Sequence, residues 1–218
     1  MRVCWFANAS GVGPPLSNDD LDRLAGIFKD IPGVTETHLF TPGATHDPYL
    51  HDGAPPRLAM QVYFDGLAAL ETASDVLSVL PDFLGADFTQ QAMLARPFTP
   101  PVRLDTACTY LVAYEGTAEN LPLWLAHYLS HHASVMTRFP GVKIVEVCTR
   151  LDWVGGVAWP RVEHMQRNKV VFADEAALAA ALASPVRHEM RADFEKFPPF
   201  SGPVSHFPMT TRIIRKTT

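Results

Sequence analysis

The chain has 218 residues, which is enough for one large domain or two small ones, and 47% of them are hydrophobic, as in a globular protein with a sizeable core. The net charge of −5 argues against a nucleic-acid-binding protein, and no apolar run has the length of a membrane span. The three cysteines are widely spaced and no secretory leader precedes them, so we expect a cytoplasmic protein and interpret Cys4, Cys108 and Cys148 as small buried apolar residues.

The first half of the chain predicts the order strand, helix, strand, strand, helix, strand. We expect strands over 2–9, 34–40, 58–64 and 88–94, and helices over 19–29 and 66–80. Ser17 or Asn18 is placed to cap the first helix, and Pro32-Gly33 ends it. A proline-rich linker over 97–101 then closes this half.

The same order of elements returns in the second half. We expect strands over 106–114, 142–149, 165–172 and 205–214, and helices over 121–137 and 174–183. Pro32-Gly33-Val34 and Phe64 recur at one constant offset, as Pro140-Gly141-Val142 and Phe172. The pattern predicts an α+β fold of two tandem ferredoxin-like β-α-β-β-α-β units, 1–101 and 102–218. Their sheets would pack together as a pseudo-twofold α+β barrel with a cavity between them.

The helix over 121–137 carries the strongest chemical signal. At about 100° per residue, His132 falls in the middle of the apolar stripe, His131 lies at its edge beside Trp124, and His127 faces the polar side. A buried imidazole costs free energy unless it is hydrogen-bonded or neutral. His132 is therefore either a satisfied core histidine or a group with a role in chemistry.

The two halves differ at this position and in one insertion. Counting back from each proline, the first half has Leu24 where the second has His132. The second half also carries extra residues within 184–206, which we expect to form a lid or pocket wall. The segment over 150–164 either closes the same pocket or forms a hydrophobic hairpin patch or dimer contact. The side chains of interest in these two segments are His188, Glu189, Asp193, Glu195, Phe194, Phe197, Phe200, His206, Trp153 and Trp159.

The second half resembles the EthD-like family of the dimeric α+β barrel superfamily. The matching residues are Trp124 with Tyr128, His132, Phe139-Pro140-Gly141-Val142, and Val171-Phe172 through Ala176-Ala177-Leu178 to Ser184. The first half looks like a degenerate copy that keeps the Pro-Gly and the Phe but has no histidine. The resemblance implies a barrel that two chains usually form, here formed by tandem halves. Relatives include cofactor-free isomerases, dehydratases, lyases and monooxygenases acting on small cyclic or aromatic compounds, and others bind haem.

Our leading hypothesis is a cofactor-independent lyase, isomerase or dehydratase that acts on a small aromatic or cyclic compound. A histidine suits the proton transfers of such reactions, with His132 as base or acid, His188 or His206 as its complement, and Asp193 or Glu189 orienting an imidazole. The substrate-binding candidates are Tyr110, Tyr114, Trp124, His131, Trp153, Trp159, Phe197 and Phe200.

Two alternatives remain open. His127 and His131 have the i,i+4 spacing that can hold one metal, so a metal- or haem-dependent oxygenase is the second hypothesis, although no HExxH or CxxC pattern accompanies them. A non-catalytic binder of a small aromatic ligand is the third. We expect no organic cofactor, because Gly11-Val12-Gly13-Pro14 lacks the P-loop pattern. The expected partner is a small-molecule substrate, with no nucleic acid or membrane, and the expected assembly is a monomer or homodimer.

Overall fold

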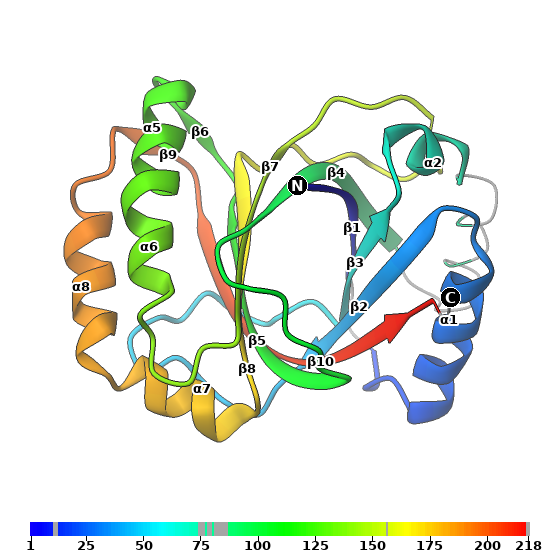
Figure 1. Ribbon diagram of the computed structural model, residues 1–218, viewed down its shortest axis with the longest axis horizontal. Helices are drawn as coiled ribbons and strands as arrows, with labels where there is room; N and C mark the ends of the chain where they lie inside the picture. The colour runs from blue at the N-terminus through cyan, green and yellow to red at the C-terminus, as the bar shows by residue number, and fades with distance from the viewer. Residues whose placement is uncertain (11–12, 74–76, 78–79, 81–86, 156, 217–218) are drawn as a thin grey trace.

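The computed structural model describes residues 1–10, 13–73, 77, 80, 87–155 and 157–216. Eight long strands close into one barrel and the helices lie outside it (Figure 1). The barrel strands are β1 (Arg2–Ser10), β2 (Val34–Pro42), β3 (Leu58–Phe64), β4 (Asp87–Pro97), β5 (Thr106–Tyr114), β7 (Ile144–Arg150), β8 (Gln166–Phe172) and β10 (Val204–Arg215). The helices are α1 (Asn18–Asp30), α2 (Leu67–Thr72), α5 (Leu121–His127), α6 (Ala133–Met136), α7 (Glu175–Leu182) and α8 (Pro185–Phe194).

The order of the strands confirms the predicted fold class. Each half has its fourth, first, third and second strand side by side, β4-β1-β3-β2 and then β10-β5-β8-β7, as in a ferredoxin-like unit. The halves join where the fourth strand of one pairs with the second strand of the other, β4 with β7 and β10 with β2. Both junctions are antiparallel, so the barrel has a pseudo-twofold arrangement and its long strands have no open edge.

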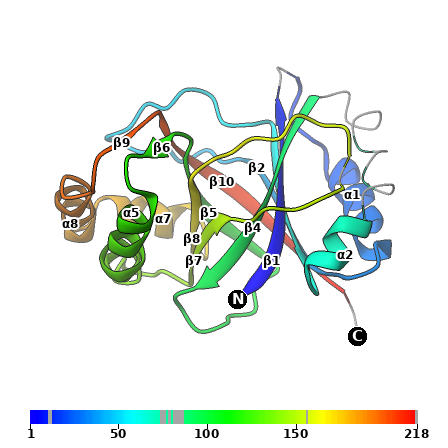
Figure 2. The same cartoon turned by 90° about the horizontal axis from the view of Figure 1, so that it is seen from above.

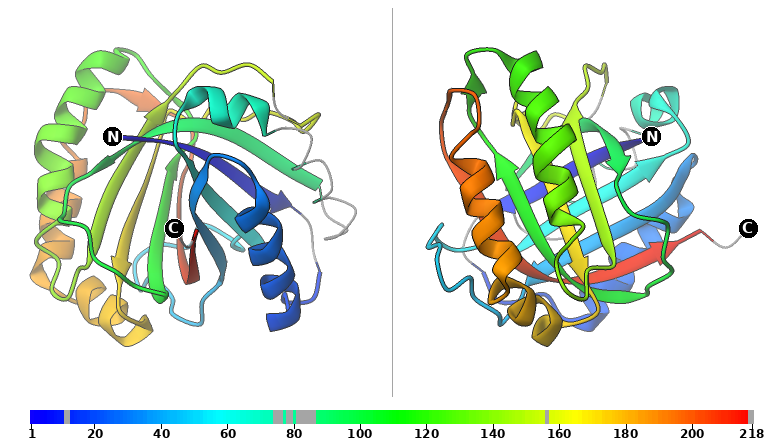
Figure 3. Two further views of the ribbon diagram at one scale, coloured as in Figure 1. Left: turned by 45° about the vertical axis from the view of Figure 1, so that its right-hand side comes forward. Right: turned by 60° about the vertical axis from the view of Figure 1, so that its left-hand side comes forward.

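Alternating side chains point to opposite faces of the barrel wall. On the outer face of the first half, Trp5 packs with Leu24 and Phe28 under α1 and α2. On the outer face of the second half, Tyr114 and Trp124 belong to a separate core under α5 to α8. These two helical layers lie on opposite sides of the barrel (Figures 2 and 3).

The predicted helix over 121–137 forms, but it is not regular. Asn120 caps α5 by accepting from the Leu123 N–H, and a π-helical turn over Tyr128–His132 connects α5 to α6. A π-turn holds one residue more than an α-turn, so the phase of the helix changes there. As a result the buried face includes Trp124, which we had expected at the edge, together with Tyr128 and His132.

Two segments contain secondary structure that differs from what we expected. The insertion over 184–206 contains α8, which packs on α6 and the π-turn, and β9 (Phe200–Ser201), which pairs with β6 (Thr117–Ala118). Of the helix expected over 66–80, the structure shows α2, while 74–76 and 78–79 lie outside the described residues.

Ser17 caps α1 as predicted, in a capping box with Asp20. No helix in the described ranges is long and apolar enough to cross a membrane.

Candidate active site

A cavity of about 100 Å³ lies between the outer face of the second half's sheet and its helices. Val112 and Val170 line it from β5 and β8, and Met136, Leu182 and Phe194 line it from the helices. The location corrects our expectation, because we had placed the pocket between the two sheets. The helices rather than the second sheet therefore form its opposite wall.

His132 lies in the wall of this cavity and is held by a carboxylate. Its Nδ1 is 2.8 Å from Asp193 Oδ2, which α8 brings across from the inserted segment. Burial lowers the pKa of His132 to about 4, although Asp193 partly opposes that shift. The ring is therefore neutral at pH 7, and with Nδ1–H donated to Asp193 the lone pair resides on Nε2. This is the arrangement of a histidine general base oriented by a carboxylate.

The opposite end of the cavity is polar and is built by both halves. Tyr110 and Arg187 line it, and Asp47 from the loop over 43–57 accepts a hydrogen bond from the Tyr110 hydroxyl. Arg187 Nη2 lies 3.4 Å from Asp47 Oδ2, and its Nε is buried without a partner. Figure 2 shows this loop of the first half reaching across to the second half. An anion in the cavity would therefore meet a partly unpaired guanidinium.

His206 completes this polar end. Its Nδ1 is 2.7 Å from Asp52 Oδ2 in the same loop, and its ring lies 5.7 Å from that of Tyr110. Burial lowers the pKa of His206, although Asp52 opposes the shift. Two histidines, each paired with a carboxylate from another segment, thus line one cavity.

The structure brings together five of the predicted site residues. His132, His206, Tyr110 and Tyr114 line the cavity and Asp193 bonds His132. Trp124, Phe197 and Phe200 form an aromatic cluster behind the lining, and Phe197 contacts the His132 ring at 4.8 Å between centroids.

The other four predicted residues lie elsewhere, which corrects their expected placement. His188 lines a neighbouring hollow beside Tyr49, and His131 is exposed and packs on His127. Trp153 and Trp159 pack against the core of the first half. The segment over 150–164 follows β7, which pairs with β4 of the first half. It therefore covers the first half and cannot also close the cavity of the second half.

Three residues of the site were missed from the sequence. Arg187, Asp47 and Asn168 carry much of its polarity, and Asn168 Nδ2 donates to the Tyr128 hydroxyl at 2.5 Å while its Oδ1 is buried without a partner. Arg187 lies in the segment for which we predicted a lid or pocket wall, but we assigned it no role. Asp47 lay in a loop of the other half. Asn168 lay in the polar run Gln166-Arg167-Asn168-Lys169, which gave no signal for it in particular.

A metal site receives no support from the described residues. They contain no group of three or more histidine, cysteine or acidic side chains arranged to hold an ion. His127 and His131 stack at 4.9 Å between ring centroids, and His127 Nε2 lies 3.3 Å from Asp193 Oδ1 without hydrogen-bond geometry.

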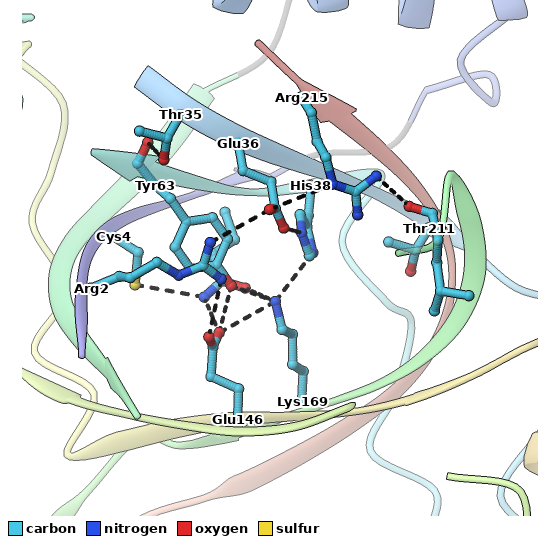
Figure 4. Close-up of polar contacts among 12 residues, drawn as sticks. Arg2, Cys4, Thr35, Glu36, His38, Tyr63, Glu146, Lys169, Thr211 and Arg215 are labelled. Carbon is cyan, nitrogen blue, oxygen red and sulfur yellow. Dashed lines mark hydrogen bonds and ion pairs between the residues drawn. The ribbon is translucent and has the colours of Figure 1, made fainter. Parts of the chain in front are cut away.

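The interior of the barrel holds a second set of polar residues that sequence reasoning missed. Lys169 Nζ lies 3.3 Å from Glu146 Oε1 and donates to Gln61 Oε1 at 3.0 Å, while the Tyr63 hydroxyl donates to Glu146 at 2.5 Å (Figure 4). His38 Nδ1 lies 3.1 Å from Lys169 Nζ. We call these residues, with Glu36 and Arg2, the interior network.

Every member of the interior network has a partner. Although burial alone would raise it, the pKa of Glu146 lies below its ordinary value because of Lys169, Tyr63 and Arg2. In the sequence, the signal for the interior network is the presence of charged side chains at alternate positions of its strands. Because the network is fully paired and joins strands of both halves, we assign it to stability and to the alignment of the halves.

Comparisons with known proteins identify the fold. No protein-family profile matches the chain, and no characterised sequence does. An anthrone oxidase-like protein aligns with TM-score 0.63 and 10% identity, covering 97% of this chain and 93% of its own. A candidate monooxygenase from Lactobacillus acidophilus aligns with TM-score 0.58 and 10% identity, covering 98% and 96%. These likenesses, with the strand order, show a dimeric α+β barrel fold.

An EthD family protein from Bacillus halodurans also aligns, at 17% identity. It covers 45% of this chain and 96% of its own, with TM-score 0.36, which is too low to bear on the family.

Proposed function

We propose that this α+β barrel protein is a cofactor-independent lyase, isomerase or dehydratase that acts on a small aromatic or cyclic compound. The chemistry would reside in the half over 102–218, an EthD-like unit, and the half over 1–101 would be its degenerate duplicate. The observation that carries the proposal is the His132–Asp193 pair in the wall of an otherwise apolar cavity.

The residues suggest one course for the reaction. Nε2 of neutral His132 takes a proton from carbon next to a carbonyl, and Asp193 stabilises the imidazolium that forms. The electron pair of that C–H bond forms a C=C bond while the π pair of the carbonyl moves onto its oxygen, and Arg187, whose Nε has no partner, would stabilise the enolate. In an isomerase the imidazolium returns the proton to another carbon of the enolate as the C=O bond re-forms. In a dehydratase the C=O bond re-forms as the C–O bond on the next carbon breaks, and the leaving hydroxyl takes the proton and departs as water.

The size of the cavity limits the substrate. An apolar cavity of roughly 150 Å³ takes one benzene ring, and this cavity measures about 100 Å³. Leu50 and Arg187 line both the cavity and the neighbouring hollow of Tyr49 and His188. A single-ring compound would therefore extend towards that hollow.

Hydrogen–deuterium exchange tests the proposal without knowledge of the natural substrate. Purified protein is incubated in D₂O with single-ring ketones and lactones, and the loss of the α-proton signals is followed by NMR. Wild-type protein should accelerate exchange of at least one compound, and His132→Gln should reduce the rate by about a hundredfold or more. His131→Gln, an exposed change on the same helix, should leave it unaltered.

Undiminished exchange in a folded His132→Gln variant would refute the proposed base. A compound that binds in the cavity, is recovered unchanged and shows no accelerated exchange would instead identify a non-catalytic binder of aromatic ligands.

A further inference from the structure

A second cavity, of about 90 Å³, lies inside the barrel, further along the same strands from the interior network. Its walls are largely apolar and come from five strands of both halves, with Phe6, Ala59, Leu111 and Met209 among them. Val112 and Asn168 belong to the strands that separate the two cavities and line both, whereas His132 and Arg187 line only the first. It is therefore a separate site on the inner side of the barrel wall.

Arg167 brings a charge into this cavity that the protein does not neutralise. The side chain is 5% exposed and comes from β8, two residues before Lys169. Its Nε donates to Gln91 Oε1 at 3.4 Å, and its guanidinium lies 5.0 Å from the centre of the Phe6 ring. Among the described residues, no carboxylate forms an ion pair with it and its terminal nitrogens have no hydrogen-bond acceptor.

The contrast with Lys169 is informative because both cations are buried on the same face of one strand. Lys169 is matched by Glu146, whereas the carboxylate that most affects the pKa of Arg167 is Glu115, which is exposed, lines the same cavity and accepts from the Ser205 hydroxyl at 2.9 Å. Burial lowers the pKa of Arg167 to about 10, so the guanidinium stays charged at neutral pH. A buried charge without a counter-ion is costly.

Two further polar atoms in the same wall lack partners. His164 Nδ1 and Asn8 Oδ1 are both buried without a hydrogen bond, and both residues line the cavity with Arg167. Burial, with Arg167 nearby, lowers the pKa of His164 to about 3, so this imidazole is neutral and adds no second charge. Unsatisfied groups gathered around one space indicate a polar ligand, since buried polar atoms are nearly always paired.

We propose that the barrel interior binds a short aliphatic monocarboxylate. Its carboxylate would pair with the Arg167 guanidinium, and its hydrocarbon body would lie against Phe6, Leu111 and Met209. The charge of Arg167 requires an anion, the apolar walls favour a hydrocarbon body, and the volume excludes a large ring. This site is independent of the proposed function, because the wall of the barrel separates it from His132.

Calorimetric titration with butyrate tests the proposal, and butyramide serves as the uncharged equivalent of the same shape. Sodium chloride and inorganic phosphate at equal ionic strength distinguish a carboxylate site from general anion binding. Butyrate should bind saturably, butyramide at least about tenfold more weakly, and affinity should rise from acetate to butyrate as more hydrocarbon is buried.

Substitutions test whether butyrate binds inside the barrel. Arg167→Gln should weaken butyrate by about tenfold or more, whereas Arg150→Gln, the same change at an exposed position, should not. Should Arg167→Gln fail to fold, Ala59→Leu keeps the charge and fills the cavity, and it should also abolish binding. His132→Gln should bind butyrate as the wild type does, so that failure here and failure of the proposed active site are distinguishable.

Three results with bound ligand would overturn the proposal. They are equal binding of butyrate and butyramide, unchanged affinity in a folded Arg167→Gln or Ala59→Leu variant, and phosphate binding as tight as that of butyrate. Absence of any binding would mean that water alone fills the cavity, and would overturn it as well.

Discussion

The helical layers of the two halves share a topology but are filled differently. In the first half, Leu24 is fully buried, and Trp159 stacks on Phe88 at 4.7 Å and lies 5.6 Å from Trp5, between ring centroids. In the second half, His132 takes the place of Leu24 and a cavity remains beside it. The comparison teaches that a pocket here depends less on the backbone than on which side chains occupy the layer between helix and sheet.

The largest loss of stability should come from a substitution in the interior network, which joins the two halves. Lys169→Met leaves Glu146 buried with Arg2 as its remaining cation, at 3.6 Å, so we expect a loss of about 3–5 kcal/mol in the free energy of unfolding. Denaturant unfolding measures it, with the exposed Lys143→Met as the control. A loss near zero would show that the halves do not depend on this junction.

Truncation at the matching helix positions tests the comparison directly. Leu24→Ala should cost about 3 kcal/mol, because it opens a void in a filled core. His132→Ala should cost only about 1 kcal/mol, because the ring already borders a cavity and Asp193 keeps His127 nearby. Chemical denaturation of both variants compares them, and equal losses would contradict the difference between the two layers.

Acid should destabilise the protein partly through His132. Its pKa is about 4 when folded against an ordinary 6.5, so between these values the unfolded chain binds a proton that the folded chain does not. Stability from this group is complete above pH 6.5 and falls as the pH drops towards 4, by about 2–3 kcal/mol. His38 in the first half behaves in the same direction.

Urea unfolding across this pH range checks the prediction. His132→Gln should reduce the slope of stability against pH, and the exposed His131→Gln should not. Identical slopes in the wild type and His132→Gln would place the acid sensitivity in other groups.

The smallest expected effect is a change in the pKa of His132 when Asp193, which orients its ring, is replaced. Because Asp193 raises the pKa of His132 against the effect of burial, Asp193→Asn should lower it below about 4. NMR titration of the histidine rings measures this change, and Glu195→Gln on the exposed side serves as the control. A raised pKa would show that burial is not the dominant influence.

The fold was largely predictable because it depends on local patterns that repeat. The Pro-Gly turns at Pro32 and Pro140 fixed the order of elements in each half, and ferredoxin-like units can bury their second sheet face only against each other. For the insertion we predicted a lid or pocket wall but no helix, because its prolines and aromatic residues hide the helical pattern of α8.

The site was predictable only in part, since its contacts join distant segments. His132 and Asp193 were each visible as polar residues beside apolar ones. Asp47 could not be assigned to the site, because nothing in the loop over 43–57 shows that it crosses to the other half. The solitary Arg167 likewise became meaningful only when the barrel showed which charges lack a counter-ion.

Because of the π-turn over Tyr128–His132, the number of residues at this point sets the orientation of the preceding helix. Removing one residue there would relax the turn to ordinary α-helix and rotate the preceding segment by about 100°. Trp124 would then swing out of its aromatic cluster even though the imidazole kept its distance from Pro140. A one-residue deletion in this stretch would thus be more damaging than most substitutions, and gap-free alignments through it would match the wrong residues.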